Sequence, residues 1–488
     1  MEATARPADP LAALNVDIGI PLVVDLDQTL ILTDTLHESF ARLLFSNPLG
    51  ALASLRSLLQ GRAAFKARIA EQGMPDIACL PYRTLLVDLL REENARGRSI
   101  HLVTAADQKI ADAVAAHLGL FASATGSNGE RNLKGPHKLE YLRDRFANGF
   151  IYAGDHAADL PLFKAANGVI LCNANRRVAG AVREASPILA ELPRPQRSLK
   201  LWLRAFRVHQ WSKNFLIFVP LFVGHAYGNP ANILTDVVGF VLVCLLASAT
   251  YMLNDIADLD VDRLHHTKRL RPFASGDLPI AFGLAVAPLL ILGALIGAYL
   301  LAPAFALTML LYLCLTLAYS FGLKQLPLLD VFVISFLFML RIVMGTALLG
   351  IGYSPWLLSF SGAFFLSLAL AKRHVEVARA SHVDVEDVVG RGYRGEDWPL
   401  TLSFGIGSGL ISVVIMLLYL TNDAAPSGFY STPYWLYAVP TLVMMWLMRI
   451  WLLSNRMELD DDPVVFALCD RTSLILGASV VLAFLMAL

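Results

Sequence analysis

The segment NDIADLDVDRLHHTKRLRP, residues 254–272, decides how the rest of this sequence is interpreted. It follows the apolar run VLVCLLASATYML (241–253) without a break, so aspartates stand at the end of a stretch apolar enough for a membrane. Asn254, Asp258 and Asp262 are spaced four residues apart. A helix would therefore place all three on one face.

Carboxylates this close together repel one another, and a divalent cation removes that repulsion. Oxygen ligands suit Mg²⁺, which binds through one or two carboxylates together with substrate phosphates. Asp255 adds a further carboxylate, and the cationic stretch with Lys268, Arg269 and Arg271 can neutralise the remaining phosphate oxygens. The pattern predicts a Mg²⁺–diphosphate site. A solvated helix end with internal salt bridges is the alternative, but it leaves the adjoining apolar run unexplained.

Composition agrees with a membrane location. The 488 residues are 56% apolar and only 16% charged, with a mean hydropathy of +0.56. Long apolar runs begin only after residue 200, and the prolines of ELPRPQR (191–197) mark a boundary. We therefore expect three parts: a soluble domain (1–190), a linker with an interfacial helix (191–212) and a transmembrane domain (213–488).

Net charge and cysteine content give little direct indication of partners. The formal net charge is zero and by itself says nothing about partners; no nucleic-acid partner is expected. None of the five cysteines forms a CxxC pair, which favours reduced, structural thiols over a metal or disulfide site. The N-terminal sequence has no basic stretch followed by an apolar core, so we expect no secretory signal and a cytosolic first domain.

The C-terminal part contains stretches long and apolar enough to cross a membrane. We expect nine spans, near residues 213–227, 233–254, 280–301, 303–322, 331–350, 355–371, 400–420, 433–452 and 464–487. Lys and Arg gather in alternate loops and are absent from the opposite ones, which favours nine spans by the positive-inside rule. The prediction is a multi-pass protein of the inner (plasma) membrane, with the charged loops and both candidate active sites facing the cytoplasm. Basic and aromatic residues alternate in 197–215, which suits an interfacial amphipathic helix or a polar linker with anchoring aromatics.

The soluble part alternates apolar β-branched runs with helical stretches. The runs PLVVDLDQTL (21–30), HLVTAAD (101–107) and FIYAGDHAADLPLF (150–163) each end in polar residues. Such alternation predicts a parallel α/β sheet whose ligands bind at the carboxyl ends of the strands. The residues expected to meet there are Asp25, Asp27, Thr104, Lys138, Asp155 and Asp159.

These motifs, in this order, resemble the haloacid dehalogenase superfamily over about residues 18–190. The resemblance implies a Rossmann-like, Mg²⁺-dependent phosphatase domain with a helical cap at about 34–90. Asp25 would be the nucleophile and Asp27 the general acid/base. Thr104 would bind the phosphoryl group and Lys138 would offset its charge, with Lys134 as a rival for that role. Metal ligation falls to Asp25, Asp27 and Asp155, supported by Asp159. A non-catalytic, degenerate domain is the alternative.

The motif NDxxDxxxD after the second span, followed by a basic stretch, resembles the UbiA-type intramembrane prenyltransferase superfamily over roughly 200–488. The resemblance implies an all-α polytopic domain of nine transmembrane helices. Its metal ligands would be Asn254, Asp255, Asp258 and Asp262, and Asp258 would also be catalytic. The second aspartate-rich motif of the aromatic prenyltransferases is missing, because AKRHVEVARASHVDVEDVV (371–389) opens with cations.

This departure favours the branch of polyprenyl-phosphate phosphoribosyltransferases. The segments HQWSKN (209–214), YSFGLK (319–324) and DDPVVFALCDR (461–471) also resemble that branch. The implied substrates are phosphoribosyl pyrophosphate and a polyprenyl phosphate lipid, with one Mg²⁺ site in each domain. The fused phosphatase would then remove the ribose 5-phosphate, giving polyprenyl-phospho-ribose for cell-envelope glycan synthesis.

Cations in or near the spans are the candidate substrate ligands. Arg341 lies mid-span, where a charge is costly and indicates function by default; pairing with a buried carboxylate is the alternative. The remaining candidates lie at span ends and in the loop after the acidic segment, where a single lysine or arginine can equally be a snorkelling anchor: Lys213, Lys268, Arg269, Arg271, Lys324, Lys372 and Arg373.

Two other functions stay open. The first is an aromatic or quinone prenyltransferase that uses a prenyl diphosphate and carries an appended phosphatase. The second is a transporter or lipid-binding module with a regulatory domain. The sequence also leaves a homo-oligomer open.

Overall fold

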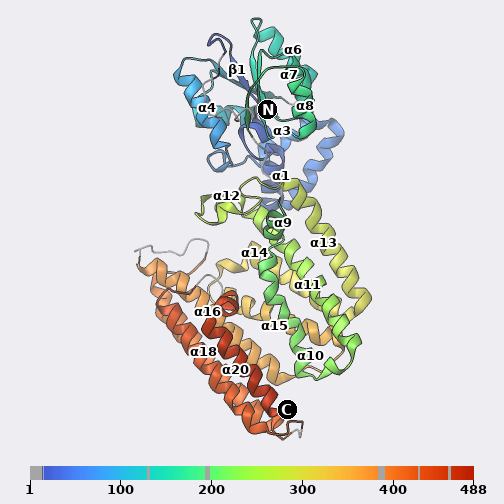
Figure 1. Cartoon of the computed structure of the whole chain (residues 1–488), viewed down its shortest axis with the longest axis vertical. Helices are drawn as coiled ribbons and strands as arrows, with labels where there is room; N and C mark the ends of the chain where they lie inside the picture. The colour runs from blue at the N-terminus through green and yellow to red at the C-terminus, as the bar shows by residue number, and fades with distance from the viewer. Residues whose placement is uncertain are drawn as a thin grey trace, which may run out of the picture. The chain divides into compact units, whose positions relative to one another are not determined.

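The computed structural model describes residues 14, 16–128, 132–192, 198–382, 391–426, 429–459 and 463–488. These residues form two compact units: Met1–Phe206 with Tyr251–Ala287, and Arg207–Thr250 with Pro288–Leu488. The acidic segment therefore belongs to the same unit as the N-terminal α/β region. Figure 1 shows the elements of both units, which are described in turn.

The N-terminal region contains a six-stranded sheet of order β3-β2-β1-β4-β5-β6, in which every paired strand is parallel. Its strands are β1 (Leu22–Val24), β2 (Ile100–Asp107), β3 (Ser123–Ser127), β4 (Ile151–Gly154), β5 (Gly168–Cys172) and β6 (Ile188–Leu192). The central strand β1 pairs with β2 on one side and β4 on the other, with Val23 opposite both His101 and Tyr152. The predicted parallel α/β sheet is confirmed.

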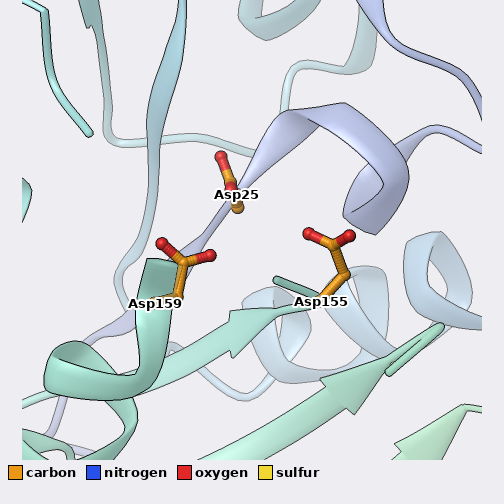
Figure 2. Close-up of side chains that lie close together, drawn as sticks. All are labelled: Asp25, Asp155 and Asp159. Carbon is orange, nitrogen blue, oxygen red and sulfur yellow. The ribbon is translucent and has the colours of Figure 1, made fainter. Parts of the chain in front are cut away.

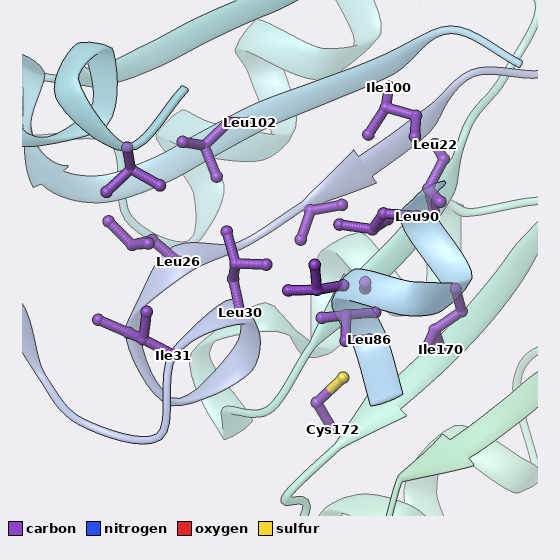
Figure 3. Close-up of a cluster of buried hydrophobic side chains, with 14 of the residues drawn as sticks. Leu22, Leu26, Leu30, Ile31, Leu86, Leu90, Ile100, Leu102, Ile170 and Cys172 are labelled. Atoms are coloured by element: carbon purple, nitrogen blue, oxygen red, sulfur yellow. The ribbon is translucent and has the colours of Figure 1, made fainter. Parts of the chain in front are cut away.

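Helices cover both faces of this sheet, because successive strand residues point to opposite sides. Leu22 and Val24 belong to one buried cluster and Val23 to another. Leu86 and Leu90 of the neighbouring helix join the first cluster, shown in Figure 3. The helices of this region are α1 (Thr35–Ser46), α2 (Pro48–Ser54), α3 (Arg62–Gln72), α4 (Thr84–Ala95), α5 (Gln108–Leu118), α6 (Pro136–Arg145), α7 (Leu160–Ala165), α8 (Arg176–Arg183) and α9 (Leu199–Ala205).

The interval 34–90, in which a cap was expected, is helical. After β1 the chain forms a short π-type turn, η1 (Leu26–Leu30), before α1 begins. Asp34 caps α1 by accepting hydrogen bonds from the amides of Leu36 and His37. Helices α1 to α3, the 3-10 turn η2 (Leu55–Gln60) and the start of α4 then fill the interval before the chain returns to the sheet at β2.

Seven helices among the described residues are long and apolar enough to cross a membrane, so this is a multi-pass membrane protein. They are α11 (Pro230–Ala257), α13 (Ile280–Leu301), α14 (Pro303–Phe321), α15 (Leu329–Leu349), α16 (Pro355–His382), α17 (Trp398–Tyr419) and α18 (Ala438–Asn455). The pair α19 (Pro463–Cys469) and α20 (Arg471–Ala487) could form an eighth, but it is bent by 83°. The predicted number of nine is not confirmed.

The first expected span, 213–227, is not a continuous helix. It consists of the 3-10 segment η5 (Val208–Phe218), the short helix α10 (Val219–Val223) and the 3-10 turn η6 (Ala226–Gly228). The residue before η5, Arg207, and the residue before η6, His225, have left-handed backbone angles, which interrupt an α-helix. The interfacial helix expected within 197–215 is likewise limited to α9.

Packing explains why η5 leaves the α-helical path. A Cβ added at Gly345 of α15 would lie only 2.0 Å from the carbonyl oxygen of Ile217, so the two backbones touch where the side chain is missing. Ile217 and Leu221 are buried. The segment η5–α10 therefore packs closely against α15 at Gly345. Averaged hydropathy carries no information about such a backbone contact.

Candidate active sites

The first candidate site lies at the carboxyl ends of β1 and β4. Asp25 follows β1, Asp155 follows β4, and Asp159 ends the 3-10 turn η4 (Ala157–Asp159). β1 and β4 are neighbours, and the strand order reverses between them, which makes this edge the usual ligand site of an open α/β sheet. One ligand oxygen from each aspartate lies within 4.8 Å of the others, and Figure 2 shows the three side chains around one space.

Lys138 provides the positive charge at this cluster. Its Nζ lies 3.0 Å from Oδ1 of Asp25 and donates a hydrogen bond of 2.8 Å to the hydroxyl of Tyr152. The lysine is buried on α6, with 1% of its surface exposed, so this charge is held in place rather than solvated. Between the two lysines that the sequence offered, the structure places Lys138 at Asp25, whereas Lys134 lines a neighbouring cleft.

Asp27 and Thr29 leave the same turn toward different partners. The backbone between them reverses at Gln28, which has a left-handed φ of 57°. Asp27 accepts a 2.8 Å hydrogen bond from the amide of Thr35, and Thr29 donates through its hydroxyl to Asp155 at 3.4 Å. Burial, reinforced by neighbouring carboxylates, raises the pKa of Asp27 to about 7 and that of Asp155 to about 8.

A cleft of about 240 Å³ opens beside Asp27. Lys66 of α3 and Lys134 line it together with Asp27. The Nζ of Lys66 donates to the carbonyl oxygen of Ala105 at 2.7 Å, which fixes its position over the carboxyl end of β2. Thr104 on the same strand is fully buried, and its hydroxyl accepts from the amide of Ala106 at 3.1 Å.

The donor set of the first site fits Mg²⁺. Three carboxylates have converging oxygens and are opposed by one lysine, and burial together with the neighbouring carboxylates raises the pKa of Asp155. A divalent cation would balance this charge. Among the described residues this is the one group of three or more acidic, histidine or cysteine side chains that meets the geometric condition for a metal ion.

The acidic segment of residues 254–272 forms the second candidate site. Helix α11 ends at Ala257, and Asp258 precedes the short helix α12 (Leu259–Leu264). Of the face expected for Asn254, Asp258 and Asp262, the structure shows the contact between the first two: the side-chain amide of Asn254 donates to Asp258 at 3.0 Å. Arg271 lies between the other two aspartates, 3.2 Å from Asp255 and 2.5 Å from Asp262.

Arg271 therefore holds the two outer carboxylates of the motif through its guanidinium. Burial raises the pKa of Asp262, although Arg271 opposes this shift. Carboxylate oxygens are the donors that Mg²⁺ prefers, but among the described residues the oxygens of this motif do not converge as those around Asp25 do. The metal site expected here therefore stays a prediction. Lys268 and Arg269 follow in the 3-10 turn η7 (Lys268–Leu270), where Arg269 is exposed.

Arg341 of α15 is the central cation of the second unit. It is 4% exposed and donates to Oδ1 of Asn214 at 2.8 Å, to the carbonyl of Leu337 at 2.6 Å and to the hydroxyl of Tyr312 at 2.9 Å. These partners are neutral. The rings of Phe338 and Tyr312 also face its guanidinium, and Lys213 lies 5.9 Å from the Phe338 ring. Arg341 and Lys213 thus lie near one common ring, that of Phe338.

Arg373 of α16 is engaged differently. It is fully buried, 2.8 Å from Oδ2 of the equally buried Asp330, and it also contacts Glu376. The hydroxyl of Tyr393 donates to Asp330 at 2.7 Å, so this cation sits in an internal network. Lys324 lies in the 3-10 turn η8 (Leu323–Gln325) and Lys372 beside Arg373 on α16. Residues 383–389 of the segment 371–389 and residues 461–462 of the segment 461–471 lie outside the described residues.

The chain matches the model of the UbiA prenyltransferase family over residues 216–469, which is more than half of its length. This protein belongs to the UbiA prenyltransferase family. The match includes the whole acidic segment and Arg341. Solved UbiA structures are similar at low identity: a UbiA homolog from Archaeoglobus fulgidus bound to GPP and Mg²⁺ is 14% identical, with a TM-score of 0.44 over 59% of this chain and 99% of that one.

The curated relatives differ in how much of this chain they match. The uncharacterized protein y4nM of Sinorhizobium fredii is 48% identical over 97% of this UbiA-family chain and 92% of its own. Nodulation protein NoeC of Azorhizobium caulinodans is 32% identical over 58% of this chain and 93% of its own. Decaprenyl-phosphate phosphoribosyltransferase of Corynebacterium glutamicum is 39% identical over 36% of this chain and 54% of its own.

Several side chains at these sites were not singled out from the sequence. Only the folded structure shows that Tyr152 and Lys66 lie near the first site, because neither belongs to a recognisable motif. Asn214 and Tyr312 hold Arg341 from other elements. For Tyr152 the signal available was its position in the strand that ends at Asp155; Lys66, in a helix rich in Ala, Arg and Lys, offered none.

Proposed function

We propose that this UbiA-family enzyme transfers a phosphoribosyl group from phosphoribosyl pyrophosphate to a polyprenyl phosphate and then removes the ribose 5-phosphate. The product would be polyprenyl-phospho-ribose for cell-envelope glycan synthesis. The observation that carries the proposal is a pair of cation sites of different character. One lies beside the acidic motif, and the other, at Arg341, has neutral partners and no aspartate motif of its own.

This arrangement favours two anionic substrates of different kinds. The motif of Asp255, Asp258 and Asp262 would hold Mg²⁺, which when bound offsets the charge of a diphosphate. Arg341 suits a lipid phosphate, because a buried cation whose hydrogen-bond partners are neutral attracts an anion strongly, and Lys213 lies near the same Phe338 ring. The relatives named decaprenyl-phosphate phosphoribosyltransferase support this choice of substrates.

In the transfer, an oxygen of the lipid phosphate attacks the anomeric carbon of the ribose. The bond from that carbon to the diphosphate oxygen breaks, and diphosphate leaves with the electron pair. Positive charge develops on the ribose ring, so the residues act by positioning and by stabilising the leaving group. Arg271 can exchange its carboxylate partners for phosphate oxygens, while Arg341 orients the attacking phosphate.

In the second reaction, Asp25 attacks the phosphorus of the ribose 5-phosphate and forms an aspartyl-phosphate. Asp27 donates a proton to the departing 5-oxygen and later takes one from the water that attacks the phosphorus of the aspartyl-phosphate. That attack breaks the bond from phosphorus to Asp25 and releases inorganic phosphate. A pKa of about 7 suits Asp27 for both roles. Lys138 offsets the charge on Asp25 and the phosphoryl group, and Tyr152 keeps this lysine in place. Thr104 would bind a phosphoryl oxygen.

Both sites would face the cytoplasm. The acidic loop and the α/β region belong to one unit, which supports a location on the same side of the membrane. Helix α11 crosses the membrane once and ends at that loop, so its start at Pro230 would lie on the opposite side. The chain would then have to cross a first time within residues 207–229, between the α/β region and α11. Eleven residues of η5 and five of α10 can supply it, because rises of about 2.0 and 1.5 Å per residue give about 30 Å, the thickness of the hydrocarbon core.

The test is to incubate the purified full-length protein with Mg²⁺, phosphoribosyl pyrophosphate and a polyprenyl phosphate, and to analyse the lipid by mass spectrometry. Wild type should yield a ribosyl-phosphate lipid without the 5-phosphate. Asp25→Asn should leave transfer intact and accumulate the lipid that retains the 5-phosphate.

Other outcomes separate the two halves of the proposal. Free ribosyl lipid from Asp25→Asn would refute the phosphatase assignment. A 5-phosphate lipid from wild type would place the phosphatase on another substrate. Absence of lipid product with several prenyl lengths would instead favour an aromatic acceptor and a prenyl diphosphate donor, the alternative that the family description keeps open.

A further inference from the structure

The loop that carries the acidic motif is held by helix α1 of the α/β region, within the first unit. The guanidinium of Arg263 makes a two-point contact with the carboxylate of Glu38, at 2.5 and 3.2 Å. Its Nε donates to the carbonyl oxygen of Ala274 at 3.0 Å. The side chains of Arg263 and Glu38 are only 6% and 4% exposed, so this is a buried ion pair rather than a surface one.

Further contacts bring the same loop against the same region. Gly276 has a left-handed φ of 78°, and a Cβ there would lie 2.6 Å from the Cβ of Leu32, so its backbone rests directly on the turn before α1. Arg204 of α9 donates to the carbonyl oxygen of Leu270 at 2.6 Å. The backbone contact at Gly276 and the hydrogen bond at Leu270 thus hold the loop against the α/β region at two further points, both later in the chain than Arg263.

Helix α1 also begins at the first candidate site. The amide of Thr35, its first residue, donates to Asp27, and Glu38 follows about one turn later. On the other side of the pair, Arg263 directly follows Asp262, the last carboxylate of the motif. One turn of helix and one ion pair therefore join the candidate phosphatase residue Asp27 to the candidate diphosphate loop.

We propose that the α/β domain is a positioning partner of the transferase: Glu38, through Arg263, holds the motif loop in the arrangement that binds diphosphate. The proposal rests on the transfer function proposed above. Glu38 touches no substrate and acts only by fixing Arg263, and thereby Asp262. Removing one member leaves the other as an uncompensated buried charge, which must move toward water and take the loop with it.

Charge exchange across the pair tests this in the full-length protein. The variants are Glu38→Arg, Arg263→Glu and the double variant that combines them, with Glu38→Gln as a milder change that keeps the side-chain shape. Incorporation of ribose-labelled phosphoribosyl into lipid measures transfer whether or not the 5-phosphate is removed. Hydrolysis of p-nitrophenyl phosphate in the same samples measures the phosphatase separately.

Each single reversal should lower kcat of transfer by about tenfold to a hundredfold, the effect of small misplacements of reacting groups. Phosphatase activity should stay within about twofold, and the double variant should regain most of the transfer. The matched control is Arg42→Glu, because Arg42 pairs with Asp260 of the same loop at 2.9 Å but both are exposed. That variant should change transfer by less than about twofold.

Unchanged transfer in the single variants would overturn the proposal. So would parallel loss of both activities without recovery in the double variant, since that pattern indicates general unfolding. Hydrogen–deuterium exchange of the loop peptide 258–275 is the readout independent of activity. If exchange is faster in the single variants and returns to the wild-type rate in the double variant, Glu38 and Arg263 hold the loop, even if wild type fails to use these substrates. Equal exchange in all variants refutes the proposal.

Discussion

Replacing Asp155 by Asn should stabilise the α/β region without Mg²⁺ and remove most of the stabilisation that Mg²⁺ gives to wild type. The three carboxylates of the first site have oxygens within 4.8 Å of one another, and burial together with this repulsion raises the pKa of Asp155 to about 8. At pH 7 the folded, metal-free protein therefore holds a proton on Asp155 that the unfolded chain, with an ordinary pKa of 3.8, has released, and this proton uptake costs up to about 4 kcal/mol that an asparagine avoids. Lys138 offsets part of the repulsion, so we expect a net gain of about 2 kcal/mol without metal.

With Mg²⁺ the order reverses. A cation at a hundred times its dissociation constant stabilises the native state by about 2.7 kcal/mol. Wild type should gain this amount, whereas Asp155→Asn, having lost a ligand, should gain little. The asparagine retains an oxygen that can accept from Thr29, so the local hydrogen bond survives and the change isolates the charge.

The assay is thiol labelling at Cys172, which is buried in β5 and becomes reactive only when the sheet opens. Peptide mass spectrometry assigns the label to this cysteine in the full-length protein. A stabilisation of about 2 kcal/mol corresponds to roughly thirtyfold slower labelling. Asp88→Asn is the control, because Asp88 forms an exposed pair with Arg91 and should show no dependence on Mg²⁺.

The reasoning is refuted if Asp155→Asn labels faster than wild type in EDTA, or if it retains the full response to Mg²⁺. The first result would mean that repulsion is already neutralised in the metal-free protein. The second would mean that the cation binds elsewhere.

Three further predictions concern the second unit. Arg341→Gln should raise KM for the lipid phosphate about tenfold or more while leaving KM for the ribosyl donor unchanged, because a charged hydrogen bond contributes about 1.5–3 kcal/mol; steady-state kinetics with each substrate varied decides it. Arg373→Met should cost about 3–5 kcal/mol by stranding Asp330, and adding Asp330→Leu should recover most of the thermal stability in detergent. Gly345→Ala should lower that stability by about 1–3 kcal/mol, since its methyl group meets the carbonyl of Ile217; an unchanged melting temperature would show that η5 can shift freely.

The first site could be predicted from sequence because its geometry follows from strand order. Asp25 and Asp155 each end a β-branched run, and parallel strands bring such ends to one edge. Nothing in that logic identifies Tyr152 or Lys66, whose contacts depend on where a helix returns to the sheet. The choice between Lys134 and Lys138 likewise required the fold, since both stand close to the start of α6.

The membrane part was predicted less completely, because hydropathy records composition and not backbone path. Residues 213–227 are apolar enough for a span, yet Gly345 draws Ile217 into backbone contact and a 3-10 segment results. Arg341 was singled out by its depth alone, and its side-chain partners Asn214 and Tyr312 lie on other elements. Arg373 is just as charged, but Asp330 on the neighbouring helix α15 binds it.

The acidic loop shows why a domain boundary drawn from hydropathy differs from one drawn from contacts. Sequence separates residues 1–190 from the apolar remainder, because lipid and water select different side chains. Contacts instead place Tyr251–Ala287 with the N-terminal region, since the loop has its own buried partner in Glu38. A loop of short helices and 3-10 turns has little regular structure to keep its aspartates in register, so contacts with the α/β region contribute to their placement. A fused domain that supplies such support would be retained for the transferase even if its phosphatase chemistry were lost.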